Sequence, residues 1–105
     1  MSAYAVEISP DAFEDLRAIQ TYISRELGSP AAAARTVRQI LETIGRLERF
    51  PLRNGILATL PDGRVLRRAK AENYLALYVT TDSTVSVLAV IYGRGDVEKR
   101  LAGLF

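Results

Sequence analysis

The stretch that decides the fold is residues 64–96, RVLRRAKAENYLALYVTTDSTVSVLAVIYGRGD. Two of its segments, 74–80 and 84–92, are rich in β-branched and aromatic residues, and the polar residues 81–83 join them. Such segments on either side of a short polar loop predict a β-hairpin. Residues 64–71 add a possible third strand in front of it. The run 87–91 is apolar without clean alternation, which predicts a central strand whose two faces are both at least partly covered.

The residues before this stretch predict one strand and two helices. Tyr4, Val6 and Ile8 alternate with small or polar residues, so a short strand is expected over about 3–8. Ser9-Pro10-Asp11 then supplies an N-cap, a proline at the first helical position and an acid in the first turn. The same start signal returns at Ser29-Pro30. Each start is followed by one apolar stripe at helical spacing: Ala12, Leu16, Ile19, Ile23 and Leu27, then Ala33, Val37, Ile40, Ile44 and Leu47, with Leu41 widening the second stripe.

The two predicted helices form a hairpin. The first ends at Gly28 and the second runs over about 30–49, so only Gly28 and Ser29 separate them. So short a link makes the helices antiparallel neighbours. Phe50-Pro51 stops the second helix, and turn signals flank a short apolar run at 56–60 that is a loop or one short strand.

The predicted fold is therefore α+β, with an N-terminal strand, an αα-hairpin, and then an antiparallel β-meander that the helices cover on one face. Asp96 is placed to cap a final turn in which Val97, Leu101 and Leu104 or Phe105 share a side. With 105 residues, nearly half of them apolar, residues 1–105 are expected to form one domain.

Composition excludes several kinds of chemistry. The chain has no histidine and no cysteine, which removes Ser-His-Asp and Cys-His catalysis, thiolates, disulfides and His- or Cys-ligated metals. Scattered carboxylates support no metal site, and no cofactor is predicted. The sequence has no long apolar run and no signal-peptide pattern at its start, so we expect a soluble, cytoplasmic protein with no membrane partner.

Positive charge is concentrated in the second half of the chain. Residues 1–48 hold five Arg against seven acids, whereas residues 49–105 hold nine basic residues against five acids. Only Asp62 opposes the basic residues between positions 49 and 70, which are Arg49, Arg53, Arg64, Arg67, Arg68 and Lys70. This local excess would attract a polyanion or an acidic protein segment.

A set of residues spread along the chain resembles the RelE/ParE superfamily of toxins from bacterial type II toxin-antitoxin systems. The resemblance covers almost the whole chain and is closer to ParE-like members. It rests on Ile8-Ser9-Pro10-Asp11-Ala12, Asp15-Leu16, Ile19, Tyr22-Ile23, Ile44, Leu47, Phe50-Pro51, Asn73-Tyr74-Leu75, Tyr78, Val90-Ile91-Tyr92-Gly93-Arg94 and Asp96.

The resemblance implies a growth-inhibiting toxin of the kind linked to plasmid stabilisation, neutralised by a cognate antitoxin protein in a hetero-oligomer. Two targets stay open. ParE-like members poison DNA gyrase and have no recognised nuclease site, which implies no catalytic activity. RelE-like members are metal-independent endoribonucleases that cut mRNA on the ribosome.

One position favours the ParE-like reading. When the superfamily's strand pattern Gly-Tyr-Arg-Leu-x-Tyr is laid on residues 73–78, the arginine of the nucleases falls on Leu75. Leucine cannot hold a phosphate. The superfamily's second arginine matches Arg94, but the tyrosine expected after it falls near Arg100.

The candidate site residues follow from these patterns. If the chain is a nuclease, the basic residues that could bind RNA phosphates are Arg67, Arg68, Lys70 and Arg94. Strand alternation predicts Arg68 and Lys70 on one face and Arg67 on the other. Glu72 is a weak candidate for a base. The residues predicted to contact a target or an antitoxin are Arg64, Arg67, Arg68, Lys70, Tyr74, Tyr78, Tyr92 and Arg94.

Overall fold

The computed structural model describes residues 3–93 and 96–104. Its elements follow the predicted order, with four strands in the second half of the chain. They are β1 (Ala5–Ile8), α1 (Pro10–Thr21), the π-helical turn η1 (Tyr22–Glu26), α2 (Pro30–Gly45), the 3-10 turns η2 (Arg46–Glu48) and η3 (Pro51–Arg53), β2 (Ile56–Thr59), β3 (Val65–Ala71), β4 (Tyr74–Thr80), β5 (Thr84–Tyr92) and α3 (Val97–Leu104).

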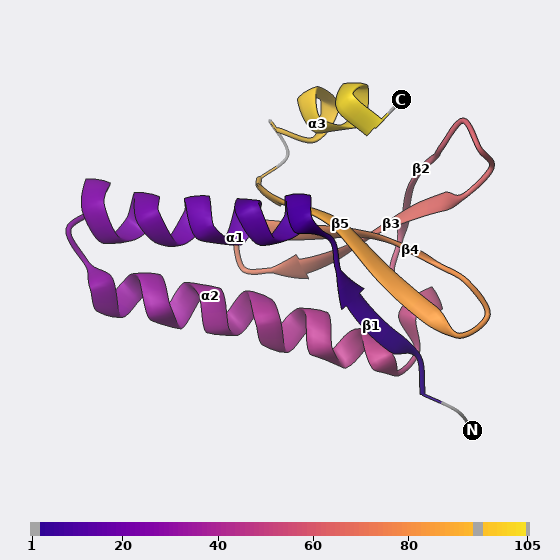
Figure 1. Cartoon of the computed structure of the whole chain (residues 1–105), viewed down its shortest axis with the longest axis horizontal. Helices are drawn as coiled ribbons and strands as arrows, with labels where there is room; N and C mark the ends of the chain where they lie inside the picture. The colour runs from indigo at the N-terminus through magenta and orange to yellow at the C-terminus, as the bar shows by residue number, and fades with distance from the viewer. Residues whose placement is uncertain (1–2, 94–95, 105) are drawn as a thin grey trace.

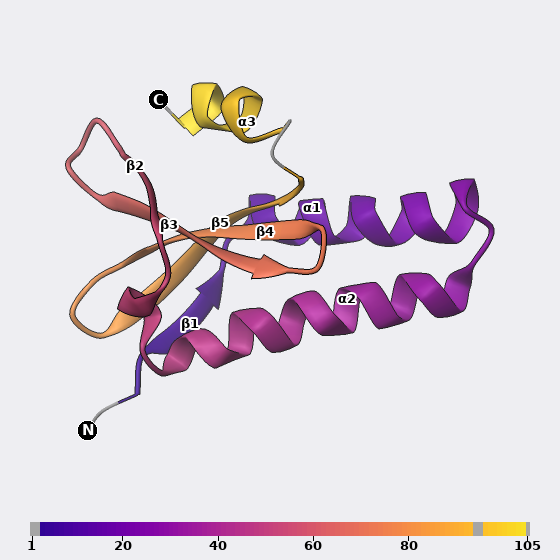
Figure 2. The same cartoon turned by 180° about the vertical axis from the view of Figure 1, so that it is seen from behind.

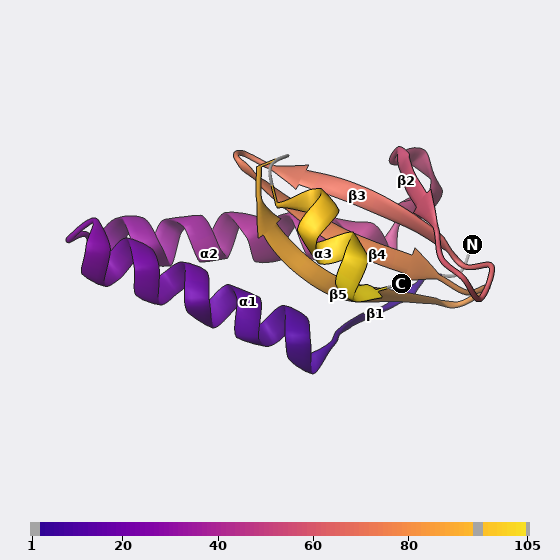
Figure 3. The ribbon, with the colours of Figure 1, turned by 90° about the horizontal axis from the view of Figure 1, so that it is seen from above.

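All five strands form one sheet in the order β1-β5-β4-β3-β2. β1 runs parallel to β5, and the other neighbours are antiparallel. The α1–α2 hairpin covers one face and extends beyond the sheet at its closed end (Figure 1, Figure 2). The short α3 lies over the opposite face, near β4 and β5 (Figure 3). The predicted α+β fold is confirmed, and the parallel addition of β1 to the meander is a feature that the sequence did not predict.

Both predicted helix starts are present. The Ser9 Oγ accepts a hydrogen bond from the Ala12 N–H at 3.1 Å, and the Ser29 Oγ accepts one from the Ala32 N–H at 3.2 Å. The helix ends differ from the prediction, because α1 passes into the π turn and α2 passes into η2. A π turn changes the rotation per residue. Leu27, placed in the apolar stripe by helical spacing, is consequently 61% exposed.

The buried residues form one layer on each side of the sheet. The layer beneath the helical hairpin contains Ala12, Leu16, Ile40, Ile44, Leu47, Ala69, Ala71, Ala76, Tyr78, Val85, Val87 and Val90. The layer on the other side contains Leu60, Leu66, Leu75, Leu77, Val79, Ala89 and Ile91, with Val97 and Leu101 of α3 packed on it. The predicted covering of both faces of β5 is confirmed.

A register shift in β5 makes that double covering possible. Leu77 pairs with Ala89 and Tyr78 pairs with Val87, which leaves Leu88 as an extra residue. The alternation of side chains between the two faces of the sheet therefore shifts by one residue at Leu88. Val87 and Val90 face the helical hairpin, whereas Ala89 faces α3.

Asp15 joins three elements at this point. The Val90 amide lies beyond the last residue that pairs with β1, and it donates a 2.9 Å hydrogen bond to the Asp15 Oδ2. The same oxygen accepts a 2.6 Å hydrogen bond from the Arg100 guanidinium of α3. This hydrogen bond raises the pKa of Arg100. Ser9 adds a second link from α1, because its Oγ donates to the Leu88 carbonyl at 3.3 Å.

We expect Asp15→Ala to lower the free energy of unfolding by about 2 kcal/mol, because it leaves the Val90 amide and the Arg100 guanidinium without their shared acceptor. The matched control is Glu14→Ala, which removes only an exposed 3.9 Å pair with Arg17. This control should change stability by about 0.5 kcal/mol or less. Urea unfolding followed by circular dichroism measures both, and equal midpoints for the two variants would contradict the role given to Asp15.

Candidate functional site

The basic residues of β3 lie on opposite faces of the sheet. Arg67 shares the hairpin-covered face with Ala69, whereas Arg68 and Lys70 alternate onto the other face and are exposed. The sequence predicted this division. Three cations at the middle of one strand therefore do not converge on one phosphate.

Arg67 is tied to the main chain of the neighbouring loop. Its Nη1 donates hydrogen bonds to the Asn54 carbonyl at 2.8 Å and to the Leu52 carbonyl at 3.2 Å. A guanidinium presents several donors in a fixed plane, and here two carbonyl groups of the segment around η3 accept from it. Arg67 thus acts as an anchor for η3.

Tyr78 is a second anchor for η3, and this corrects the prediction that its side chain contacts a partner. The side chain has no exposed surface, and its hydroxyl donates to the Pro51 carbonyl at 2.5 Å. The same hydroxyl accepts a 3.0 Å hydrogen bond from the Asn54 Nδ2. Burial raises the pKa of Tyr78. Since Arg67 and Tyr78 are paired across β3 and β4, one rung of the sheet holds η3 in place.

Tyr74 and Tyr92 lie at the other end of the sheet. Their rings meet edge to face, with centroids 5.2 Å apart. Tyr74 is half-buried and burial raises its pKa, whereas Tyr92 is 58% exposed. The pair lines a groove of about 940 Å³ between the end of the sheet and the overhanging helical hairpin. Exposed Tyr22 and Leu27 continue its apolar lining on the helical side.

The remaining predicted residues occupy separate places. Arg64 pairs with Asp62 in the exposed β2–β3 turn at 2.7 Å, and hydrogen bonds from Arg64 lower the pKa of that carboxyl group. Glu72 is exposed in the turn between β3 and β4 and has a φ of 55°. Leu75 is buried beneath α3, on the face away from the helical hairpin. Arg94 lies outside the described residues.

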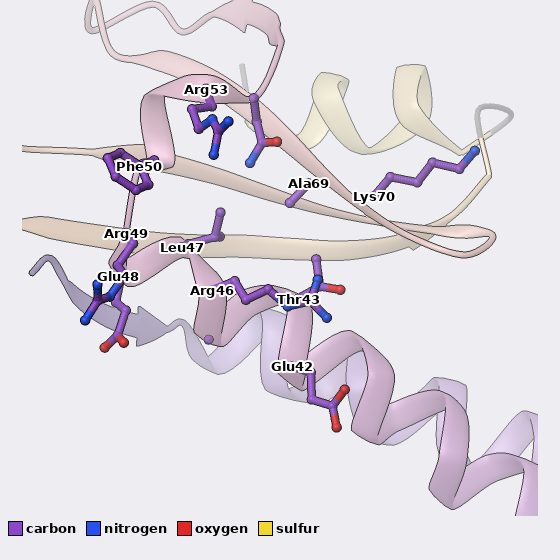
Figure 4. A pocket seen from close by; sticks show the side chains of 12 residues that line it. Glu42, Thr43, Arg46, Leu47, Glu48, Arg49, Phe50, Arg53, Ala69 and Lys70 are labelled. Atoms are coloured by element: carbon purple, nitrogen blue, oxygen red, sulfur yellow. The ribbon is translucent and has the colours of Figure 1, made fainter.

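A cavity that the sequence did not reveal lies where α2, η2 and η3 meet β3. Its volume is about 770 Å³, and Figure 4 shows the side chains around it. It brings together Arg46, Arg49 and Arg53 with Phe50 and the backbone of β3. The run of basic residues around positions 49–53 was visible in the sequence. Nothing in the sequence indicated that Phe50 adopts a left-handed conformation, with φ 55° and ψ 46°.

The described residues do not assemble a catalytic centre for RNA cleavage. Such a centre needs a base at the ribose 2′-hydroxyl, a cation at the phosphate and an acid at the leaving oxygen. Arg67 and Tyr78 are used to hold η3, while Arg68 and Lys70 lie on the other face. Within residues 3–93 and 96–104, no three acidic side chains cluster as a metal site would require.

Two solved structures share this architecture. A chain of the chromosomal ParDE toxin-antitoxin system from P. aeruginosa superimposes with a TM-score of 0.73 at 19% identity, covering 88% of this chain and 98% of that one. A chain of the archaeal RelE-RelB complex from Pyrococcus horikoshii OT3 gives a TM-score of 0.57 at 21% identity, covering 86% and 94%. This chain therefore shares its fold with both structures, as expected from the sequence resemblance.

The family follows from the sequence. The sequence model described as the ParE toxin of the type II toxin-antitoxin system, parDE, matches residues 6–97. The chain belongs to this family of toxins. A comparison with curated protein sequences finds no match. No helix in the described part of the chain is long and apolar enough to cross a membrane.

We expect Arg67→Ala to lower the free energy of unfolding by about 2 kcal/mol, because two loop carbonyl groups lose a charged donor. Arg68→Ala removes the same charge from an exposed neighbour and should change stability by about 0.5 kcal/mol or less. Chemical unfolding of the two variants measures the difference. Equal losses would show that Arg67 does not anchor η3.

Tyr78→Phe should cost about 1–2 kcal/mol at neutral pH, since the Pro51 carbonyl loses its donor in a buried place. Tyr92→Phe, which removes an exposed hydroxyl, is the control and should be nearly neutral. The cost should shrink above about pH 10. The reason is that the pKa of Tyr78 is raised in the folded chain, so its contribution is complete below the unfolded pKa and is lost as the pH rises through the folded pKa. A pH-independent cost would contradict this assignment.

Proposed function

We propose that this toxin acts in the cytoplasm by binding DNA gyrase, without covalent chemistry of its own, and that a cognate antitoxin neutralises it. The observation that carries the proposal is the match to the ParE toxin family over residues 6–97, together with an apolar residue at the nuclease position. Leu75 is 8% exposed and packs among apolar side chains. A phosphate could not be bound there without burying its charge against hydrocarbon.

The distribution of the other candidates supports binding over cleavage. A single cation at a phosphate is not enough for RNA cleavage, because a proton acceptor and a proton donor must be placed at the same bond. The tyrosine nearest to Arg67, Tyr78, donates its hydroxyl proton to the Pro51 carbonyl. Tyr92 lies at the far end of β5 from it. The alternative of a RelE-like mRNA endonuclease stays a prediction for which the described geometry offers no specific support.

We assign the antitoxin to the groove at the end of the sheet. Its exposed lining includes Tyr22, Leu27 and Tyr92, which are 55%, 61% and 58% exposed. Apolar patches of this kind on a small protein mark sites that a partner covers. An amphipathic helix in the groove would cover this surface, and the two edge strands, β1 and β2, offer a separate place for an added strand. The exposed Arg68 and Lys70 are available to an acidic segment of the same partner.

The test of the target is a supercoiling assay with purified gyrase and relaxed plasmid. An excess of the toxin should block supercoiling, and prior addition of the antitoxin should restore it. The Tyr22→Ser/Leu27→Ser variant should still inhibit gyrase while escaping the antitoxin, because it changes only the groove assigned to that partner. Full supercoiling at toxin excess would overturn the proposal. Cuts at translated codons in transcripts from cells expressing the toxin would favour the endonuclease instead.

A further inference from the structure

The cavity at the end of α2 combines exposed guanidinium groups with an exposed aromatic ring. Arg46, Arg49 and Arg53 are all exposed, and Figure 4 shows Arg46 and Arg53 at the cavity, with Phe50 beside Arg53. Glu42 and Glu48 also line it. Lys70 contributes its backbone, since its side chain extends along β3 away from Phe50 (Figure 4). The local charge is thus carried by arginine.

None of these arginines is neutralised by the fold. Among the described residues, ion pairs within 4.0 Å join only Arg17 with Glu14, Arg64 with Asp62, and Arg100 with Asp15. Glu42 and Glu48 accept no hydrogen bond from the cavity's arginines. Three arginines against two glutamates leave the cavity lining with a net positive charge, which attracts anions. The arginines of the cavity are therefore available to bind an anion from another molecule.

Phe50 is held at the cavity in a strained conformation. Its φ of 55° lies in the left-handed region, which is unfavourable for a bulky residue, and its side chain is 56% exposed. A strained backbone persists only where its surroundings impose it, and such residues cluster at functional sites. Here the surroundings are visible, because Arg67 and Tyr78 fix η3 directly after Phe50.

This anchoring presents the ring between two hollows. Phe50 lines the 770 Å³ cavity and also a second one of about 440 Å³ that includes Tyr4 and Leu52. The Arg53 guanidinium lies 5.5 Å from the centre of the ring. An aromatic ring beside a guanidinium group, in a cavity that two further arginines line, offers a stacking surface near phosphate-binding donors. Both features are exposed and neither is needed to fill the core.

From these observations we infer that the Phe50 cavity is a binding site for single-stranded nucleic acid, with a base on the Phe50 ring and phosphates on Arg46 and Arg53. Stacking separates this occupant from an acidic peptide, because a carboxylate side chain has no π-face to place on the ring. It also separates a single strand from a duplex, in which the base faces are already stacked. The site does not depend on gyrase being the target, and it involves no catalytic step.

Fluorescence anisotropy tests the inference with the full chain and labelled single strands of about twelve nucleotides, one of DNA and one of RNA. Both strands should bind at low salt. A duplex of the same length should bind less tightly. The affinity should fall as salt rises. A plot of the logarithm of the binding constant against the logarithm of the salt concentration should have a negative slope of about 0.7 for each phosphate contact. A polyglutamate peptide serves as a competitor that represents an acidic protein segment.

Two variants separate the ring from the fold. Phe50→Gly removes the ring and relieves the left-handed strain, so it should be at least as stable as the wild type yet bind about fivefold or more weakly. Phe50→Tyr keeps a ring and should keep the affinity. Arg46→Gln/Arg53→Gln should lower both the affinity and its dependence on salt. The charge-matched control is Arg25→Gln/Arg35→Gln, in η1 and the first half of α2, and it should have a smaller effect.

The inference is overturned if the single strands do not bind, or if the duplex binds equally well and Phe50→Gly has no effect. Competition by polyglutamate as effective as that by unlabelled strand would also overturn it, and would assign the cavity to an acidic protein segment. Equal loss of affinity in the two charge-matched variants would show that general positive charge, not this cavity, holds the strand.

Discussion

The arrangement of the layers depends on the Asp15 carboxylate. One oxygen atom accepts from the Val90 amide of β5 and from the Arg100 guanidinium of α3, so the helical hairpin, the sheet and the last helix meet at a single acceptor. Among the described residues, neither the Val90 amide nor the Arg100 guanidinium has another side-chain acceptor. A buried or half-buried donor without an acceptor is costly, which makes this carboxylate a constraint on all three elements. The phase change around Leu88 is what turns β5 toward both layers.

The rung formed by Arg67 and Tyr78 has a comparable effect at the other end of the sheet. The pair fixes η3 through three hydrogen bonds to main-chain carbonyls, and the loop it fixes carries Phe50 and Arg53. Arg67, a candidate phosphate-binding residue of a nuclease, is thus used for positioning together with Tyr78. Two hollows remain open on the surface and are the places that we propose for partners. One is the apolar groove beside Tyr92, and the other is the arginine-lined cavity beside Phe50.

The parts of the fold that local sequence determines could be predicted. Ser9-Pro10 and Ser29-Pro30 placed both helix starts, and residues 74–80 and 84–92 matched β4 and β5. The π turn that exposes Leu27 could not be predicted, because no local residue type demands it. The role of Asp15 was missed for another reason. Its partner Val90 is 75 positions away, a separation that local sequence patterns do not reach.

In the candidate site, too, features set by local sequence could be predicted and features set by long-range contacts could not. Alternation correctly separated Arg67 from Arg68 and Lys70, since it depends only on the strand. Whether Tyr78 was buried depended on the loop at Pro51, which sequence patterns do not place against β4. The strain at Phe50 depends on that same long-range anchoring.

The central claim is that this toxin acts by binding gyrase and performs no chemistry on RNA. The most direct measurement follows plasmid supercoiling and transcript 5′ ends together in cells producing the toxin without its antitoxin. Our account predicts that negative supercoiling is lost at the onset of growth arrest while transcripts remain intact. Arrest with unchanged supercoiling and new 5′ ends within translated codons would contradict it.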